Sequence, residues 1–227
     1  MMSEPLVRPS MLQRLKLREP FSGLSHLGGA ILGIAALVVL VSVARGDPWH
    51  VSGFVIYGAS LIVLYMASAM YHLLPVGARH IARLRLFDHI GIYLLIAGTY
   101  TPICLVPLRG GWGWSLFGVV WGLALFGIIA EIVWRSAPYW LSLVLYLIMG
   151  WLVLIALGPL ARILPHAAIG WLFAGGIVYT VGAAVFALDR PRLWPGIFGA
   201  HDLWHLFVLG GSACHFVLML RFVAPFP

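Results

Sequence analysis

The sequence predicts an all-α protein, a single bundle of seven transmembrane helices. Of its 227 residues, 62% are hydrophobic and only 9% are charged, whereas a soluble domain has about 25% charged residues. Such a chain cannot cover itself with a hydrated surface, so its solvent is lipid. The apolar residues also fall into seven runs of the length that crosses a membrane, about 20 residues each.

The first four runs are bounded by residues that end helices or attract water. Residues 25–44 follow a polar, basic N-terminal segment and end at ARGDPWH. Residues 51–74 end at PVGARHIARLR, the basic cluster that precedes the run 87–107. Residues 113–134 lie between PLRGGWG and RSAPYW. Because Gly and Pro interrupt helices and Arg is costly in hydrocarbon, each break predicts a loop at a membrane surface.

The last three runs are divided in the same way. Residues 139–158 end at GPLARILPH, residues 167–188 end at DRPRLWPG, and residues 200–222 lead to the C-terminus. Connections this short make successive helices antiparallel, which predicts an up-and-down bundle. Gly and Ala recur within the runs and allow helix backbones to approach closely.

The distribution of basic residues predicts the orientation of the bundle. The side of the N-terminus receives Arg8, Arg14, Lys16, Arg18, Arg79, Arg83, Arg85, Arg135, Arg190 and Arg192. The other side receives only Arg45, Arg109, Arg162 and Arg221. Since basic loops stay in the cytoplasm, we expect a cytoplasmic N-terminal segment at 1–24, the transmembrane domain at 25–222 and an external tail at 223–227. The basic clusters suit anionic lipid headgroups, and nucleic acid is not expected as a partner.

Ionisable side chains inside membrane helices are costly and therefore point to function. The clearest pattern is HDLWH at the start of the seventh run. His201 and His205 are four residues apart, so they lie on one face of a helix and can bind the same ion. Two histidines that only form hydrogen bonds at a helix start would show the same pattern, so the pair alone leaves both interpretations open.

The predicted topology brings further polar residues to the same end of the bundle. His72 ends the second run, with Ser68 one turn before it on the same face, and Asp88 begins the third run. The second helix ends on the cytoplasmic side, where the third and seventh helices begin. We therefore expect these residues and the HDLWH pair in one layer near the cytoplasmic face.

Three neutral imidazoles with one open coordination position are typical of a catalytic zinc site. We expect His72, His201 and His205 to bind zinc, which activates water at neutral pH. Asp88 is expected beside that water as a proton acceptor, and Ser68 as a hydrogen-bond donor to the water or to the developing oxyanion. Calcium and magnesium prefer several carboxylates and fit this set poorly.

Four other polar residues receive structural or open interpretations. His26 opens the first run and either lines the same cavity or bonds to a loop. His89 points about 100° away from Asp88 around the helix and is expected in packing or at an interface. His215 lies about 15 Å deeper than the HDLWH pair and is expected to be buried and hydrogen-bonded. Asp202 is expected to orient a neighbour or to cap the helix start.

The pattern Ser68-x-x-x-His72, Asp88 and His201-x-x-x-His205 resembles the progestin and adipoQ receptor family, and more closely its bacterial hemolysin III branch. The resemblance covers nearly the whole chain, including the stretches YGASLIVLYMASAMYH, RLRLFDHIGIYLLIAGTYTP and HDLWHLFVLGGSACH. It implies seven helices and a zinc ion held by the three histidines, with the aspartate and the serine near its water.

The entry motif of that family is only partly present. The family has an acidic residue followed by an Asn and a Ser/Thr-His pair. Glu19, Ser25 and His26 match this motif, but Ser22 stands where the Asn is expected. The resemblance also places the chain in a superfamily with alkaline ceramidases, which implies hydrolysis of a lipid amide.

Three functions are compatible with this sequence. The first is a zinc-dependent hydrolase that acts on a lipid amide or ester. The second is a non-enzymatic membrane-lipid sensor, regulator or receptor-like protein in which zinc is structural. The third is a pore-forming haemolysin, which the sequence supports least because no run carries a regular polar stripe. In each case the expected partner is membrane lipid and the expected location is the cell membrane, crossed several times.

Overall fold

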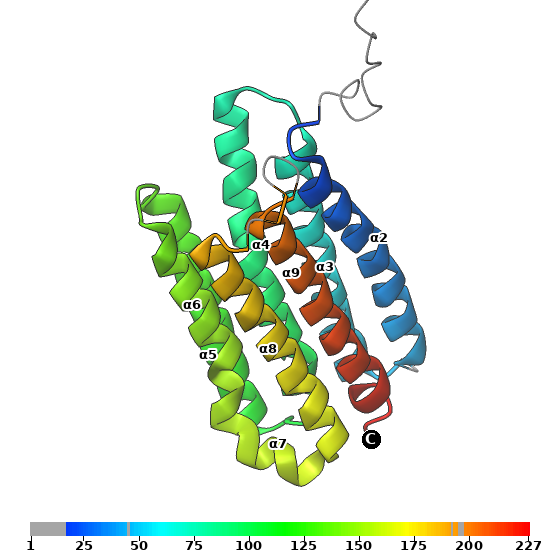
Figure 1. Ribbon diagram of the computed structural model, residues 1–227. Helices are drawn as coiled ribbons and strands as arrows, with labels where there is room; N and C mark the ends of the chain where they lie inside the picture. The colour runs from blue at the N-terminus through cyan, green and yellow to red at the C-terminus, as the bar shows by residue number, and fades with distance from the viewer. Residues whose placement is uncertain (1–16, 45, 192, 195–197) are drawn as a thin grey trace, which may run out of the picture.

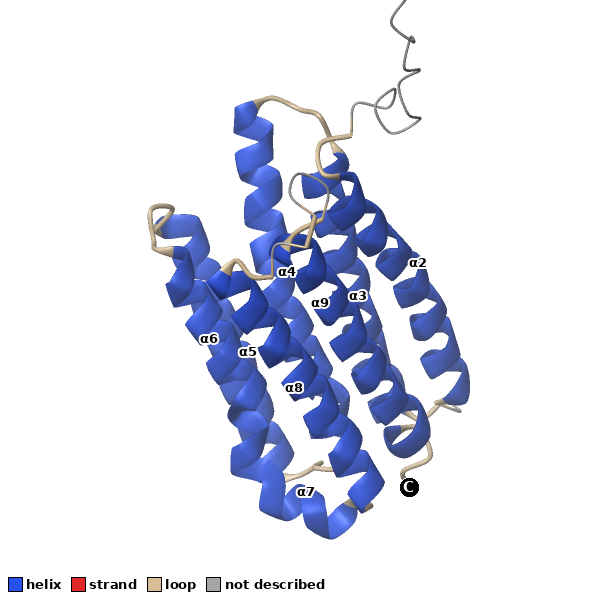
Figure 2. Cartoon of the chain, viewed as in Figure 1, coloured by secondary structure: helices blue, strands red, loops and turns tan. Residues whose placement is uncertain are grey.

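The structure is a computed structural model that describes residues 17–44, 46–191, 193–194 and 198–227. The described residues contain no β-strand (Figure 2), which confirms the predicted all-α class. The helical segments are α2 (Pro20–Val43), α3 (Pro48–Leu73), α4 (Ala78–Leu105), α5 (Gly111–Val133), α6 (Tyr139–Trp151), the 3-10 segment η1 (Leu152–Ala156), α7 (Leu157–Ile163), α8 (His166–Leu188), α9 (Ala200–Leu218) and the π-helical turn η2 (Met219–Val223).

Six helical segments of the described chain are long and apolar enough to cross a membrane. They are Pro20–Val43, Pro48–Leu73, Gly111–Val133, Trp140–Ile163, His166–Leu188 and Ala200–Val223. The third predicted run, 87–107, falls on α4 up to the end of that helix at Leu105. α4 is not one of the six, because polar residues such as Asp88 and Thr99 interrupt its apolar sequence. The protein is therefore a multi-pass membrane protein, and a seventh crossing by α4 stays a prediction.

Two predicted boundaries are wrong. α4 begins at Ala78 rather than at residue 87, because the basic segment after Gly77 contains no Pro or Gly and its Arg residues are good helix formers. The segment GPLARILPH was predicted to be a loop, but Leu157–Ile163 forms α7. The fifth predicted run thus continues from α6 through η1 and α7.

The helices run alternately up and down, as predicted (Figure 1). Each of α2, α3 and α4 packs against the next helix in the chain, and α8 packs against α9. α2 also packs against α9, so the first and last helices described are neighbours. The end at which α2 and α9 begin and α3 ends is called the upper end, as it is drawn in Figure 1.

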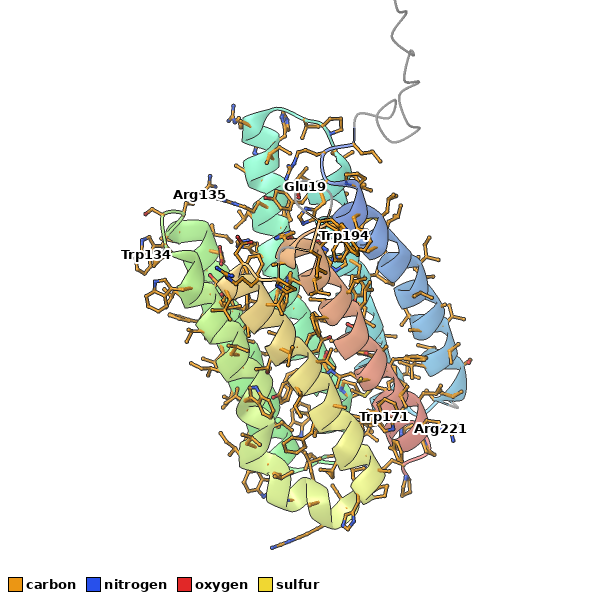
Figure 3. The ribbon with its side chains drawn as sticks, viewed as in Figure 1. Glu19, Trp134, Arg135, Trp171, Trp194 and Arg221 are labelled. Atoms are coloured by element: carbon orange, nitrogen blue, oxygen red, sulfur yellow. The ribbon has the colours of Figure 1, made fainter. Side chains whose placement is uncertain are left out.

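Aromatic and basic side chains mark both ends of the bundle. Trp134, Arg135 and Trp194 lie toward the upper end, whereas Trp171 and Arg221 lie toward the lower end (Figure 3). Tryptophan is enriched where a membrane meets water, so these positions suit the ends of the membrane spans. Of the basic residues used to predict the orientation, Arg8, Arg14, Lys16, Arg45 and Arg192 lie outside the described residues.

Small residues bring α3 and α4 into close contact. A Cβ atom on Gly53 of α3 would lie only 2.8 Å from the Cα atom of Pro102 in α4. In lipid the hydrophobic effect does not drive helices to associate, so membrane bundles depend on such close backbone packing. Farther along α3, the buried Tyr65 donates a hydrogen bond to the Ser212 hydroxyl of α9 at 2.7 Å. These contacts fix the relative positions of the helices that carry the candidate site.

Candidate metal centre

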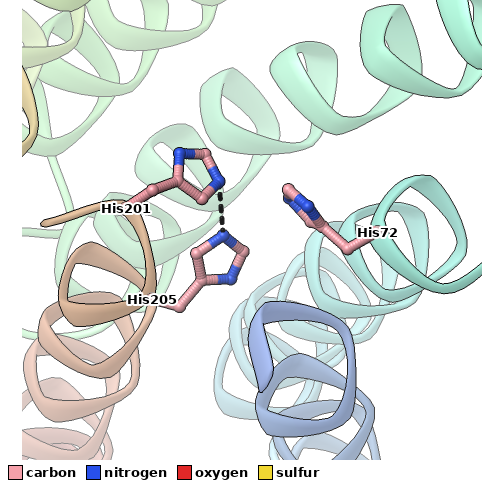
Figure 4. Close-up of side chains that lie close together, drawn as sticks. All are labelled: His72, His201 and His205. Carbon is pink, nitrogen blue, oxygen red and sulfur yellow. Dashed lines mark hydrogen bonds between the residues drawn. The ribbon is translucent and has the colours of Figure 1, made fainter. Parts of the chain in front are cut away.

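Three histidines from two helices converge at the upper end of the bundle (Figure 4). His72 lies in the last turn of α3, and His201 and His205 lie in the first turns of α9. Each offers a ring nitrogen, and the three nitrogens lie within 4.8 Å of one another. The structure thus brings together the three residues that the sequence predicted as metal ligands, although 128 residues separate His72 from His201 in the chain.

The arrangement of the ring nitrogens fits a divalent metal ion. The Nε2 atoms of His201 and His205 are 3.2 Å apart. Two nitrogens bound to one tetrahedral zinc at about 2.0–2.1 Å are about 3.3 Å apart. The Nε2 atom of His72 is buried without a hydrogen-bond partner, and an unpaired buried polar atom is unfavourable. A metal ion bound among the three imidazoles would satisfy that atom.

Glu19, immediately before α2, contacts His72, one of the two buried histidines of the cluster. Its Oε2 atom forms a short hydrogen bond with Nδ1 of His72, and its backbone N–H donates to the His72 carbonyl at 2.9 Å. Burial by itself raises the pKa of Glu19, but the hydrogen bonds from His72 and Arg18 outweigh it and hold this pKa below its ordinary value. The carboxylate form therefore faces His72, which has its Nδ1 engaged and its Nε2 directed to the cluster.

His26 of α2 lies directly beside the cluster. Its ring centroid is 4.0 Å from that of His205, and only 3% of its surface is accessible to solvent. Neither of its ring nitrogens has a hydrogen-bond partner, and Nδ1 of His205 has none either. The alternative in which His26 bonds to a loop is therefore absent from the described residues, and His26 lines the cavity described next.

A cavity of about 360 Å³ begins at the histidines and continues into the bundle. Its polar lining at the upper end includes Ser68, Asp88 and the pair His201 and His205. Ser68 and Asp88 lie beside each other on α3 and α4. The remaining wall is mostly apolar and is formed by α4, α6, α8 and α9, as far as His215.

The structure also shows the contacts of three other polar residues that the sequence singled out. Asp202 caps α9 by accepting the Gly199 N–H at 3.0 Å, as predicted. His215 is buried, and its Nε2 lies 3.4 Å from the Leu172 carbonyl oxygen. His89 was expected in packing or at an interface; it lines the cavity and contacts Glu131, with 3.4 Å between Nδ1 and Oε2.

Two contacts of the site were not foreseen from the sequence. One is the bond between Glu19 and His72, and the other is the hydrogen bond from Ser22 to Asp202 Oδ1 at 2.7 Å. Both connect the start of α2 to a helix that carries cluster histidines. The sequence did contain a signal, because Glu19 matches the entry motif and Ser22 stands at its Asn position, but a motif alone does not say which side chains its residues contact.

Comparison with known proteins agrees with this description. The family model described as haemolysin-III related matches residues 15–216. Hemolysin-3 of Bacillus cereus is 42% identical, with 99% of this chain and 99% of that protein aligned. The Hemolysin-3 homolog of Bacillus subtilis (strain 168) is 40% identical over 91% of this chain and 94% of its own. The Monocyte to macrophage differentiation factor of Homo sapiens is 27% identical over 86% of this chain and 78% of its own.

These similarities extend over the whole helical domain that carries the histidine cluster. A family match of this length and identities of 40% and above over nine-tenths of the chain leave no large part of the fold unaccounted for. The chain belongs to the haemolysin III-related family, the hemolysin III branch of the progestin and adipoQ receptor family.

Proposed function

We propose that this protein is a zinc-dependent membrane hydrolase that cleaves an amide or ester bond of a lipid. The observation that carries the proposal is the continuity between the histidine cluster and an apolar cavity inside the bundle. A metal-binding cluster alone is compatible with a structural ion. A cluster that opens into a long apolar cavity is also suited to placing a lipid carbonyl beside the ion.

The three histidines would hold the zinc ion through neutral imidazole nitrogens. His72, His201 and His205 supply three ligands, which leaves one position of a tetrahedral site open. Zinc in such a site supplies an activated water molecule and polarises a carbonyl oxygen. Calcium and magnesium are unsuitable here because they require several oxygen ligands.

Asp88 is the candidate general base. Its carboxylate lines the cavity together with two cluster histidines. In hydrolysis it would take a proton from the attacking water and return it to the leaving nitrogen or oxygen as the carbon–heteroatom bond breaks. Ser68, which lies beside Asp88, would donate a hydrogen bond to the oxyanion that develops on the former carbonyl oxygen.

The apolar body of the cavity would hold the acyl chain of the lipid. From His201 to His215, both of which line the cavity, α9 rises about 21 Å at about 1.5 Å per residue. Binding pockets for small molecules have volumes of about 300–1,000 Å³, and 360 Å³ falls in that range. This depth favours a substrate with a long acyl chain whose carbonyl lies at the upper end.

We further propose that α4 is the seventh membrane span and that the upper end faces the cytoplasm. The apolar part of α4 packs between α3 and α5. Many of its residues from Tyr93 to Leu105 are buried there. The excess of basic residues on the predicted cytoplasmic side supports the orientation. The metal centre would then act on lipid from the cytoplasmic leaflet.

The test combines metal content and turnover on the same detergent-purified samples. We expect about one zinc per chain in the wild type and cleavage of a long-chain ceramide or another long-chain N-acyl lipid. Asp88→Ala should retain zinc and lose about 10²–10⁴-fold in turnover, whereas His205→Ala should lose both. Glu131→Gln serves as a matched control because Glu131 is a carboxylate at the same end that contacts no cluster histidine.

The outcomes separate the proposal from its alternatives. If the wild type binds zinc but cleaves no acyl amide or ester, the hydrolase is wrong and a lipid sensor with structural zinc is favoured. In that case His72→Ala should destabilise the fold while Asp88→Ala has little effect. Liposome leakage that survives loss of the cluster histidines would instead favour a pore.

A further inference from the structure

The start of α2 touches both helices that carry the cluster histidines. On one side, Glu19 forms two hydrogen bonds with His72 of α3, one through its carboxylate and one through its backbone N–H. On the other side, Ser22 donates to Asp202 of α9, between the two histidines of that helix. α2 is also the helix that packs against both α3 and α9. A single helical turn therefore connects the two halves of the candidate metal centre.

The bond from Glu19 determines which nitrogen of His72 is free. A neutral imidazole carries one proton, on either Nδ1 or Nε2, and only the nitrogen without the proton can bind a metal. The carboxylate accepts a hydrogen bond from Nδ1, so the proton is held there and the lone pair is left on Nε2. That atom is buried and has no hydrogen-bond partner. A carboxylate in this position also makes the imidazole a stronger ligand.

The carboxylate is itself held in place. Oε1 of Glu19 accepts a hydrogen bond from Arg18 at 3.1 Å, while Oε2 faces His72. The Arg18 guanidinium stacks over the Tyr71 ring at 4.6 Å from its centroid. Pro20, the first residue of α2, has a fixed φ and suits the first position of a helix. Glu19 thus has few conformations to lose when His72 binds an ion.

The contact with α9 supports the same arrangement from the other side. One oxygen of Asp202 accepts from Ser22 at 2.7 Å, and the other accepts from the Gly199 N–H at 3.0 Å. The first turn of α9, which presents His201, is therefore tied both to its own N-terminus and to α2. Displacement of α2 would remove a connection between the helices that carry the ligands, and would leave direct bonds such as that from Tyr65 to Ser212.

We propose that Glu19 is a positioning residue of the metal centre, which holds the proton of His72 on Nδ1 and directs Nε2 toward the ion. This inference rests on the proposed zinc centre but not on the proposed hydrolysis. Its consequence is that zinc affinity depends on a residue outside the three ligands. Removal of such an orienting partner weakens metal binding about 10- to 100-fold in proteins where it has been measured.

The experiment measures zinc dissociation constants of the full-length protein in detergent by competition with a chromophoric chelator. Glu19→Ala removes the acceptor and should weaken zinc binding about 10- to 100-fold. Glu19→Gln keeps an oxygen that can accept from Nδ1 but loses the negative charge, so it should weaken zinc binding measurably, though less than Glu19→Ala. Glu131→Gln is the matched control because it alters the same kind of carboxylate–histidine contact at His89, outside the cluster, and should bind zinc like the wild type.

A second readout distinguishes positioning from a general structural role. Melting temperatures are measured for each variant without metal and with a fixed zinc concentration. Because a ligand stabilises the state that binds it, the zinc-induced rise should shrink in Glu19→Ala while the metal-free melting temperature stays close to that of the wild type. Visible spectra of the cobalt-substituted proteins should show an altered ligand field in Glu19→Ala and an unchanged one in Glu131→Gln.

Each result supports or overturns the inference. A wild type that binds no zinc would remove the metal centre and the inference with it. If the wild type binds zinc and Glu19→Ala binds it equally well, the role of Glu19 is wrong while the metal centre stands. A variant with a lower metal-free melting temperature and an unchanged dissociation constant would show a structural role only. Should Glu19→Ala fail to fold, Glu19→Gln alone decides, because an affinity equal to that of the wild type with an unchanged cobalt spectrum would contradict it.

Discussion

Tyr100 of α4 stabilises the point at which the fifth membrane segment changes its helical form. α6 ends at Trp151 and continues as the 3-10 segment η1. There the Tyr100 hydroxyl donates to the Gly150 carbonyl at 2.8 Å and accepts from the Val153 N–H at 2.9 Å. In a regular 3-10 helix those two backbone groups would bond to each other, so the hydroxyl is inserted into the hydrogen-bond ladder.

Replacing Tyr100 by Phe removes both hydrogen bonds and leaves the ring in place. Side-chain hydrogen bonds in membrane proteins contribute about 0.6 kcal/mol on average and up to about 1.7 kcal/mol. Two such bonds, both to backbone groups at the break, correspond to about 1–3 kcal/mol. For a chain of this length, the melting temperature should fall by about 2–10 °C.

The assay is thermal unfolding in detergent followed by circular dichroism, with a titration in a denaturing detergent as a second probe. Tyr146→Phe is the matched control, since the Tyr146 hydroxyl donates to the carbonyl of His89, at 3.2 Å, within the continuous helix α4 and otherwise interacts with the side chain of Tyr93. That carbonyl lies where the helix supplies a partner of its own, so the control should lose less than about 0.6 kcal/mol. If Tyr100→Phe is no less stable than Tyr146→Phe, the inserted hydroxyl does not stabilise the break.

Three further predictions test packing, electrostatics and topology. Gly53→Ala should destabilise the protein by about 1–3 kcal/mol, because the new Cβ would lie 2.8 Å from the α4 backbone. Gly118→Ala is the control and should leave the stability unchanged, because a Cβ there meets no atom within 4 Å. Thermal unfolding of the two variants and the wild type measures the difference. Hydrogen bonds from the backbone and ring of His50 lower the pKa of Asp47 below its ordinary value of 3.8. Its stabilising effect is therefore complete well above that value and lost as the pH falls through the lower folded-state pKa. The stability difference between the wild type and Asp47→Asn should be constant above about pH 5 and shrink as the pH falls below about 4. A reporter fused after Pro227 should be active only outside the cytoplasm, and activity inside would contradict seven spans.

Most of the fold could be predicted because lipid imposes a simple rule on sequence. A membrane helix must bury its backbone and remain apolar for about 20 residues, so run lengths alone located the helical segments. The errors arose where that rule does not apply. The segment after Gly77 is basic yet helical, and helix formation there depends on local propensity rather than on hydropathy. The 3-10 segment η1 depends on the hydroxyl of Tyr100, a contact across helices that no local pattern reveals.

The candidate site was predictable to the extent that topology determines depth. An up-and-down bundle places the end of α3 and the starts of α4 and α9 in one layer, and the structure has His72, Asp88 and the HDLWH pair at that end. Depth does not determine which side chains meet within the layer. The contacts of Glu19 and Ser22 depend on the angle at which α2 enters the bundle, which is a property of tertiary packing. For the same reason the sequence could not choose between the cavity and a loop for His26.

The position of the cluster also explains why α2 matters more than its composition suggests. α2 is an apolar helix whose buried polar residues, Ser22 and His26, lie in its first two turns. α3 and α9 each pack against α2, and their histidines meet at the level of those two turns. An ion bound there would connect parts of the chain that are distant in sequence, beside a helix that contacts both of them. Zinc binding and the docking of α2 should therefore be thermodynamically linked, so that each stabilises the other by the same free energy.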